Sequence, residues 1–512
     1  MRTTRRHGAS AEIRLDRAEH VEHPEESEDA PRRGAETDIR STVHRHVASV
    51  RFGRFSRLAL AVVVLLCGLT LIAGFVNKDR CTGPTFNADG RTTPNYSERT
   101  KEDACYSDIH YLWIARGVHR HLFPYLSGGI DSYGQLVGDT LEYPVLTGVL
   151  IWAGGYFANN DAQFLAYSAI LLAPFGLYVG WALGRLARWR ALIWALGPPL
   201  VLYAFHNWDL AVVACHVAAI YVLHRGWGRA GAARPLLRRA RVCAVLLGIG
   251  FALKLYTAMF VLPLMLYVLT GGLDGRELPA GKRYDVAGAV KVGLAAMATG
   301  ALINLPFALA GFDGWRASFV FQQERVVDVS TNSIWYWGFR PYSEPGNKGF
   351  QDFVDLASPL LILLAVGAAC AIGWWRYRRE GTFPWLAVSS AMLCAFLLLH
   401  KVHSPQYTLW LLPLFVLMRV RLGWVLAYLV ADMAMGIGIF EWFYRTESGA
   451  PSGISNGFSA QAVVIGVWGR AALLVGLFPA FARARSVVDP EPDIPFVDRA
   501  AKDDTAAQPR TG

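Results

Sequence analysis

Charged residues are scarce in this chain of 512 residues. They make up 18% of the sequence, against roughly 25% in an ordinary soluble domain. The charges that are present crowd into residues 1–57 and the polar segment 483–512, and long apolar runs fill the chain between them. Hydrophobic residues reach 53% of the total. This distribution excludes an ordinary soluble domain and predicts an all-α polytopic membrane protein.

Motifs that mark metal and nucleotide sites are also absent from the sequence. We find no metal-ligand spacing, no Gly-rich phosphate loop and no heptad run. The net charge of +10 does not indicate nucleic-acid binding, because most Lys and Arg residues lie in short clusters beside apolar runs. We therefore expect no metal, no cofactor and no nucleic-acid partner, but contact with membrane lipids.

The apolar runs are long enough to cross a membrane. The first, Leu58–Val76, has about 19 uncharged residues, enough for a hydrocarbon core of roughly 30 Å. It begins too far along the chain for a cleaved signal peptide, so we expect a retained span. In all, the sequence predicts about 11–13 transmembrane helices. The later runs lie at about 142–158, 162–184, 191–205, 208–224, 242–253, 257–271, 286–309, 354–375, 383–400, 405–418, 422–441 and 460–481.

Arginine clusters predict that both termini are cytoplasmic. Arg57 ends a cluster before the first span, and six arginines lie between Arg225 and Arg241. Both clusters should be inside, so an even number of crossings must separate them. Five apolar runs lie between them, so either 142–158 or 191–205 should not cross. The pair Pro198–Pro199 favours the second as the exception, but that choice puts three arginines at 185–190 outside, and both readings stay open.

Composition divides the chain into three parts. Residues 1–55 form a charged cytoplasmic arm and residues 482–512 a polar tail, and we expect both to be disordered because they cannot bury enough apolar surface. Residues 56–481 form the transmembrane domain. Its first outer loop, 77–141, is long and contains Cys81 and Cys105. An outer location permits a disulfide between them, although two unpaired thiols fit the sequence equally well.

Polar residues gather at the predicted outer ends of the spans. In the first outer loop, Ser107 is a suitable N-cap for a helix whose first turn holds Asp108. Arg116 continues that helical spacing. Asp108 is either a helix-terminus carboxylate or a general base at the membrane surface. Glu142, followed by Tyr143 at the start of the next span, is a second carboxylate on the same side.

Further polar residues lie on later outer segments. Asn207 and Asp209 begin one span and could be simple helix caps. Lys254 interrupts a long apolar stretch together with Tyr256, and a lone lysine there is costly unless it reaches the interface or pairs with an anion. A dense group at the end of another span, which could neutralise a lipid phosphate, comprises His400, Lys401, His403 and Gln406.

Aromatic residues are frequent in the outer loop 310–353. Trp315, Trp335, Tyr336, Trp337 and Tyr342 lie there with amide and charged side chains between them. Flat rings with neighbouring amides suit the faces and hydroxyls of sugars. An aromatic belt at the membrane interface explains any single ring equally well.

The order of these motifs resembles glycosyltransferase family 87, bacterial membrane enzymes of the GT-C fold typified by actinobacterial polyprenol-phosphate-mannose-dependent mannosyltransferases. The resemblance covers roughly residues 56–481. The matching segments are Ser107-Asp108-Ile109, Phe123-Pro124-Tyr125, Glu142-Tyr143-Pro144, Trp208-Asp209-Leu210, Leu253-Lys254-Leu255-Tyr256 and Lys401-Val402-His403-Ser404-Pro405-Gln406-Tyr407.

This resemblance implies a GT-C-like helical bundle and an inverting transferase in which an aspartate of the first outer loop is the base, here Asp108. The donor would be a polyprenyl-phosphate hexose, with mannose as the typical sugar, and the acceptor a cell-envelope glycan or glycolipid outside the plasma membrane. Donor phosphate contacts are expected from Lys254 and His403, and from Lys401 or Arg116. Other substrate contacts are expected from Glu142, Tyr143, Asn207, Asp209, Tyr256 and Gln406.

A transporter or lipid flippase is the main alternative function. Transporters place ionisable groups near the middle of the bilayer on broken helices, whereas the polar residues noted above lie at predicted outer boundaries. This placement favours the transferase. A scaffold without chemistry, such as an inactive relative, would have a similar sequence.

Overall fold

The computed structural model describes residues 55–224 and 235–489, apart from residues 341 and 345. Most of the two arms that we expect to be disordered, 1–55 and 482–512, lies outside these described residues. So does most of the arginine-rich segment between Arg225 and Arg241. The description below concerns the compact unit that begins at Phe55.

The described chain is mostly helical, as predicted, and seven stretches of helix are long and apolar enough to cross a membrane. This confirms a multi-pass membrane protein. Two of the seven join shorter elements, Asp161–Ala195 and Leu255–Gly275. The first contains α6 (Asp161–Ala187), η2 (Arg188–Ala191) and α7 (Leu192–Ala195), and the second contains η3 (Leu255–Phe260), α11 (Val261–Leu269) and η4 (Leu273–Gly275). The other five are α2 (Arg57–Asp79), α12 (Val286–Ala310), α15 (Lys348–Glu380), α18 (Leu422–Glu447) and α19 (Phe458–Arg483).

Four shorter apolar helices accompany the long ones. They are α5 (Val145–Gly155), α9 (Asp209–His224), α16 (Trp385–Leu399) and the pair η6 (Pro405–Tyr407) and α17 (Thr408–Leu417). Only the seven longer stretches in the described chain are long enough to cross by length and composition, which is fewer than the 11–13 transmembrane helices expected. A further helix, α10 (Leu236–Leu253), is as long as a span but begins with an arginine-rich turn.

The sequence left open which of the apolar runs 142–158 and 191–205 fails to cross, and the two runs differ in structure. Residues 191–205 do not form one helix: α7 ends at Ala195 and α8 (Pro198–Tyr203) begins after a turn at Gly197. The proline pair explains the break, because proline has no backbone N–H to donate to the preceding turn. Run 142–158 contains α5, a single helix of 11 residues, which extends only about 16 Å. Each of these helices by itself is therefore too short to cross.

The loop 77–141, which we predict to be outside, is a folded structure. It contains α3 (Tyr96–Glu102), α4 (Asp108–Ala115), η1 (Val118–Arg120) and two antiparallel hairpins, β1 (Thr85–Phe86) with β2 (Thr92–Thr93) and β3 (Gly129–Ile130) with β4 (Leu136–Val137). Cys81 and Cys105 form the disulfide that the sequence permitted. The loop is fastened to α6 through Asp161, whose carboxylate accepts hydrogen bonds from Arg91 and from the backbone and hydroxyl of Thr92.

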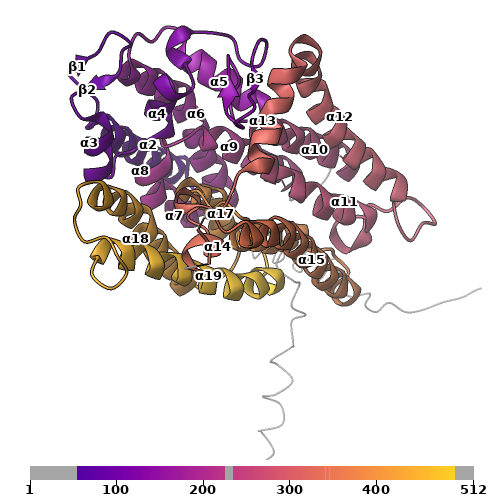
Figure 1. The fold of residues 1–512 in the computed structure, drawn as a ribbon. Coiled ribbons are helices and arrows are strands. Elements are labelled where there is room, and N and C mark those ends of the chain that lie inside the picture. Colours follow the sequence, from indigo (N-terminus) through magenta and orange to yellow (C-terminus); the bar gives the residue numbers. More distant parts are fainter. Residues whose placement is uncertain (1–54, 225–234, 341, 345, 490–512) are drawn as a thin grey trace, which may run out of the picture. The chain divides into compact units, whose positions relative to one another are not determined.

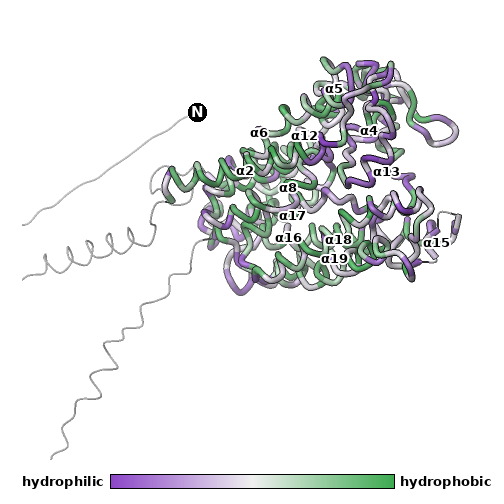
Figure 2. Tube along the Cα trace, turned by 90° about the vertical axis from the view of Figure 1, so that its left-hand side faces the viewer, coloured by the Kyte–Doolittle hydropathy of each residue, from purple (hydrophilic) through white to green (hydrophobic). Residues whose placement is uncertain are grey.

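Helix packing places α17 in the interior. All of its residues are buried, and it contacts α6, α9 and α16. The most extensive pairings are α18 with α19, α10 with α9 and α12, and α16 with α19 (Figure 1). Hydrophobic residues line the long helices and hydrophilic residues concentrate in the segments that join them (Figure 2). Leucines on α2, α12 and α15 are exposed, as expected for helices that face lipid.

The described chain continues past the predicted domain end at residue 481. After α19, Ser486 pairs with Met418 in an antiparallel bridge, and the N–H of Val487 donates to the carbonyl of Leu417. This short segment therefore covers the end of α17.

Candidate functional site

The start of α4 is fixed by the turn that precedes α9. Ser107 is the N-cap, as predicted, and its Oγ accepts a hydrogen bond from the N–H of Ile109 at 3.1 Å. The same hydroxyl donates to the carbonyl of Phe205 at 2.7 Å, and the N–H of Asp108 donates to the carbonyl of His206 at 2.8 Å. Residues almost a hundred positions apart thus hold the first turn of α4 in place.

The Asp108 carboxylate lies in a polar group formed by three segments. Asn207 Nδ2 donates to Asp108 Oδ2 at 2.8 Å and to the Tyr143 hydroxyl at 2.9 Å. His206 Nε2 lies 4.0 Å from the same carboxylate oxygen, and the Asp108 side chain is 22% exposed. Burial lowers the pKa of His206 to about 4, partly opposed by Asp108. At neutral pH, Asp108 therefore faces a neutral imidazole and remains accessible from one side.

Lys78 is a buried cation next to this group. Its side chain lies at the end of α2, is 2% exposed, and donates from Nζ to the carbonyl of Tyr106 at 2.8 Å. Its charge attracts the Asp108 carboxylate. The sequence interpretation missed Lys78, although a lysine at the outer end of a span runs against the positive-inside rule and was a usable signal.

A second group surrounds Lys254, which ends α10 at the predicted break. Its Nζ lies 3.7 Å from Asp209 Oδ2 and 4.8 Å from the centre of the Tyr143 ring. Asp209, fully buried at the start of α9, accepts a hydrogen bond from Trp410 Nε1 at 2.7 Å. Tyr256 stacks on Trp410 with ring centres 4.1 Å apart. Through Tyr143 and Asn207, this group is continuous with Asp108.

Glu142 and Arg116 form an ion pair at the side of the site. Arg116 Nε lies 2.5 Å from Glu142 Oε2, and both side chains are less than one fifth exposed. Gln322 of α13 (Phe312–Glu324) donates to the Glu142 carbonyl at 2.7 Å. The Glu142 carboxylate is thus paired with a guanidinium group, whereas the Asp108 carboxylate accepts a hydrogen bond from a neutral amide. Of the two predicted bases, Asp108 thus has the carboxylate without a guanidinium partner.

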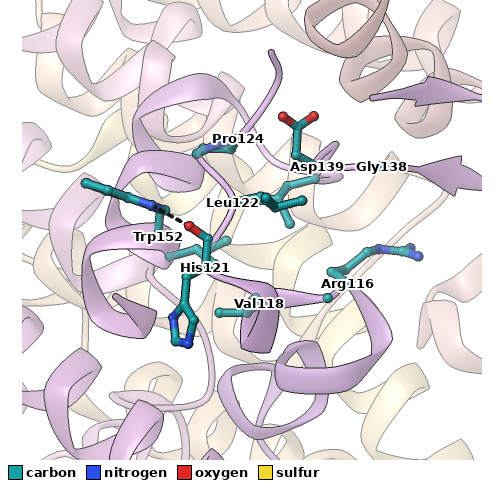
Figure 3. Close-up of a pocket in the computed structure, with 11 residues that line it drawn as sticks. Arg116, Val118, His121, Leu122, Pro124, Gly138, Asp139 and Trp152 are labelled. Atoms are coloured by element: carbon teal, nitrogen blue, oxygen red, sulfur yellow. Dashed lines mark hydrogen bonds between the residues drawn. The ribbon is translucent and has the colours of Figure 1, made fainter. Parts of the chain in front are cut away.

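Arg116 also borders a pocket of about 350 Å³ between η1 and α5, shown in Figure 3. Its wall includes Asp139 and Trp152, and the Trp152 Nε1 donates to the carbonyl of His121 at 3.3 Å. Asp139 is already engaged, because its carboxylate accepts from the backbone N–H groups of Leu126 and Ser127. The pocket is lined by a mixture of apolar and polar groups on the same side as the ion pair.

Lys401 and His403 lie apart from Lys254. Lys401 Nζ donates to Asp355 at 2.7 Å and to the carbonyl of Gln323 at 2.9 Å. His403 Nδ1 lies 3.0 Å from the carbonyl of Leu397. In the described part of the chain, neither makes a hydrogen bond or ion pair with Lys254. The structure therefore brings six of the eleven predicted site residues together in two adjoining groups, places Arg116 and Glu142 in an ion pair at their side, and places Lys401 and His403 elsewhere.

Gln406, the remaining residue, lies in η6 between these regions. It is 2% exposed, and its Oε1 has no hydrogen-bond partner among the described residues. The next residue, Tyr407, stacks on Trp410 with ring centres 3.9 Å apart. Gln406 is therefore a buried polar group whose sequence neighbour stacks on Trp410.

Three of the five aromatic residues predicted in loop 310–353 are buried and do not form an open platform for sugars, whereas Tyr342 is 65% exposed. Trp335, Tyr336 and Trp337 belong to α14 (Ile334–Trp337) and are at most 5% exposed. They pack in a hydrophobic cluster with residues of α18 and α19. Burying three large rings contributes several kcal/mol to folding, at about 1.5–3 kcal/mol for a fully buried Phe-sized side chain. Their role in the described structure is packing.

Acidic, histidine and cysteine side chains are not grouped for metal binding. Within the residues that the structure describes, no three of them gather closely enough to hold an ion. Two carboxylates at the site, Asp209 and Glu142, are instead paired with a lysine and an arginine, and Asp108 is held by an amide. This composition suits binding of a charged organic substrate.

No family model matches the chain. Among solved structures, it is similar to the crystal structure of the apo form of the Archaeoglobus fulgidus oligosaccharyltransferase, with a TM-score of 0.37 and 12% sequence identity over 89% of this chain. The match covers 60% of the length of that protein. A likeness of this degree concerns the path of the chain and assigns a role to no residue.

Proposed function

We propose that the protein is a GT-C-like membrane glycosyltransferase that moves a hexose from a polyprenyl-phosphate sugar to a cell-envelope glycan or glycolipid. The observation that carries this proposal is the arrangement around Asp108. A partly exposed carboxylate begins a helix of a folded extramembrane loop, and the buried Lys78 and the partly exposed Lys254 lie within the same polar network. By resemblance of its motifs, the sugar is mannose.

The proposed reaction needs one base and no covalent nucleophile. Asp108 takes the proton of an acceptor hydroxyl while that oxygen forms a bond to the anomeric carbon of the donor. The bond from this carbon to the phosphate oxygen breaks on the opposite side, and the electron pair leaves with the polyprenyl phosphate. A single displacement inverts the anomeric centre, as in inverting glycosidases.

Asn207 and Lys78 support the base in different ways. Asn207 orients the carboxylate by donating to Oδ2, and the hydroxyl of Tyr143 holds the same amide. Burial and nearby carboxylates raise the pKa of Tyr143, so its hydroxyl stays protonated and neutral. Lys78 lies on the α2 side, and its charge attracts the Asp108 carboxylate.

Lys254 is the proposed cation for the donor phosphate. Its side chain is 12% exposed, and its pairing with Asp209 at 3.7 Å is too long for a good hydrogen bond. An incoming phosphate oxygen can therefore bind the ammonium without first breaking a short contact. A cation placed here stabilises the negative charge that develops on the leaving phosphate. The active face is then extracytoplasmic, with the plasma membrane holding the lipid tail.

Paired substitutions test the base. In membranes given a radiolabelled polyprenyl-phosphate sugar and a cell-envelope acceptor extract, Asp108→Asn should reduce transfer by about 10²–10⁴-fold. Asparagine keeps the size and most of the capping ability, so donor binding and expression should persist. Glu142→Gln is the matched control and should have a smaller effect, because Glu142 is already paired with Arg116. Near-normal transfer in Asp108→Asn would remove Asp108 from the role, and a selective loss in Glu142→Gln would assign it there.

A further inference from the structure

The imidazole of His206 is held in one orientation beside the Asp108 carboxylate. Its Nδ1 lies 3.1 Å from the carbonyl oxygen of Tyr106, and Lys78 Nζ donates to the same oxygen at 2.8 Å. The ring packs against those of Tyr106 and Phe440, with centre-to-centre distances of 5.6 and 6.2 Å. The N–H of Asp108 also donates to the carbonyl of His206 at 2.8 Å, so the backbones of the two residues are joined as well.

The contact with Tyr106 determines which ring nitrogen of His206 carries the proton. A carbonyl oxygen only accepts hydrogen bonds, so Nδ1 is the donor. Burial lowers the pKa of His206 to about 4, so at neutral pH the ring is uncharged and has this one proton. Nε2 therefore presents a lone pair. It faces Asp108 Oδ2 at 4.0 Å, which is too far for a hydrogen bond.

His206 Nε2 and Asp108 Oδ2 are thus two hydrogen-bond acceptors that face the same space. Neither can donate to the other, so a hydrogen bond to Nε2 has to come from a bound group. The Asp108 side chain is 22% exposed and the His206 side chain 5%, so a bound group reaches the histidine from the open side of the carboxylate. A separation of 4.0 Å lets two neighbouring donor groups bind one of these atoms each.

A single hydroxyl cannot satisfy both atoms. A hydroxyl has one proton, and in the proposed reaction the nucleophilic hydroxyl gives that proton to Asp108. Its oxygen would then turn its own lone pairs towards the lone pair of His206 Nε2, which is unfavourable. A second donor beside the reacting hydroxyl removes this conflict. Two hydroxyls on adjacent carbons of a sugar fit the arrangement, because their oxygens lie about one hydrogen-bond length apart.

From this geometry we infer that His206 binds the acceptor glycan, with Nε2 accepting a hydrogen bond from a hydroxyl that neighbours the reacting one. The contact orients the reacting hydroxyl towards Asp108 and selects acceptors that have a donor group at this place. The ring is already fixed by Tyr106, so binding requires no reorientation of the imidazole. The inference rests on the proposed function, because it assigns a contact within the same transfer reaction.

Variants that imitate one ring nitrogen at a time test the inference. The amide of His206→Asn reaches about as far as Nδ1 and can donate to the Tyr106 carbonyl, but it places nothing at Nε2. The amide of His206→Gln reaches Nε2, where its oxygen can accept a hydrogen bond. In the radiolabelled transfer assay, His206→Asn should lower kcat/KM for the cell-envelope acceptor extract by about 2–10-fold, the effect of losing one neutral hydrogen bond. His206→Gln should retain most of that value, and the donor KM should stay unchanged in both.

A second pair keeps the test valid if His206→Asn does not fold. The side chain of His206→Met has nearly the length and volume of that in His206→Gln, but it ends without a strong hydrogen-bond acceptor. Its kcat/KM for the extract should therefore be lower than that of His206→Gln by the same factor. His119→Asn is the matched control, since His119 belongs to the same loop and its Nδ1 also lies close to a backbone carbonyl, that of Trp113, at 2.9 Å. It should leave kcat/KM for the extract unchanged.

Three results would overturn the inference and leave the proposed transferase intact. Normal kcat/KM for the extract in folded His206→Asn and His206→Met would exclude a contact at Nε2. A larger loss in His206→Gln than in His206→Asn would show that the histidine acts through Tyr106 alone, as a structural residue. A higher donor KM with unchanged kinetics for the extract would assign Nε2 to the donor sugar. Absence of transfer by the unaltered protein, in contrast, would reject the proposed function itself and this inference with it.

Discussion

Two buried aspartates, one on each side of the start of α17, have closely matching surroundings. Asp209 accepts a hydrogen bond from Trp410, and Asp432 accepts one from Thr408. In both cases a cation lies 3.7 Å from the carboxylate, and Oδ2 has no hydrogen-bond partner among the described residues. Thr408 and Trp410 are two positions apart, so they face nearly opposite sides of the helix, at about 100° per residue.

The two clusters differ in what lies beyond the cation. Lys254 borders Tyr143 and, through Asn207, the carboxylate of Asp108. Arg470 borders a pocket with apolar walls. The same ion-pair arrangement therefore lies beside a partly exposed carboxylate in the first cluster and beside mostly apolar side chains in the second. This contrast predicts a role in catalysis for the first cluster and a role mainly in stability for the second.

Removing each cation should separate the two roles. Lys254→Met should reduce kcat/KM for the polyprenyl-phosphate donor by about 10²–10³-fold, the usual effect of losing one group that stabilises developing charge. Arg470→Gln should reduce it by less than about tenfold. Initial rates at several donor concentrations, with folding checked by thermal unfolding, provide the measurement.

Measurements of folding stability are the control for this comparison of kcat/KM values. Arg470→Gln leaves Asp432 buried without its cation, and breaking a buried pair typically costs about 3–5 kcal/mol. The double variant Arg470→Gln/Asp432→Asn should recover part of that loss. Equal losses of kcat/KM in Lys254→Met and in a folded Arg470 variant would abolish the proposed division of roles.

Acid should affect the first cluster through His206. Burial lowers the pKa of His206 to about 4, so between pH 6.5 and 4 the unfolded chain binds a proton that the folded chain does not. Its contribution to stability is therefore complete above pH 6.5 and is lost as the pH falls towards 4. Thermal unfolding at several pH values should show a shallower decline for His206→Gln than for the original chain. An unchanged slope in this variant would exclude His206 as a source of the decline.

The helical fold class could be predicted because a chain that crosses a bilayer needs long apolar runs, often with arginine clusters beside them, and both are visible in the sequence. The spans at Leu58–Val76 and 286–309 correspond closely to α2 and α12. The break in 191–205 also had a local cause in Pro198–Pro199. The packing between helices could not be predicted in this way. The complete burial of α17 depends on its contacts with α6, α9 and α16, and no local sequence pattern specifies these contacts.

The candidate site was predictable in part. Asp108, Asn207 and Lys254 attracted attention because polar residues at span ends are rare and costly. Arg470 and Asp432 were overlooked although each interrupts an apolar run, at 460–481 and 422–441. Each is a charged residue inside a predicted span, whereas the predicted site residues lie at the ends of spans. The pairing of these two charges results from the packing of α18 against α19, which the sequence does not reveal.

The smallest effect is expected outside both clusters, at the disulfide. Cys105 lies three residues before Asp108, and its bond to Cys81 closes a loop with a sequence separation of 24. Loss of such a link costs about 3 kcal/mol in the chain-entropy view. The start of α4 has independent anchors, however, because Ser107 and Asp108 bond to the carbonyls of Phe205 and His206. We therefore expect the Cys81→Ser/Cys105→Ser variant to lose stability but only a few-fold in transfer.

Thiol labelling from outside the cell checks the bond and its location together. A membrane-impermeant maleimide should label neither Cys81 nor Cys105 until a reductant is added, and both afterwards. The double serine variant controls for the other cysteines, of which Cys67, Cys243 and Cys394 are buried. Immediate labelling would show free thiols, and labelling after reduction by a membrane-permeant maleimide but not by the impermeant one would place the loop on the cytoplasmic side. In that case Asp108 could not receive an acceptor from outside, because the same loop carries both residues.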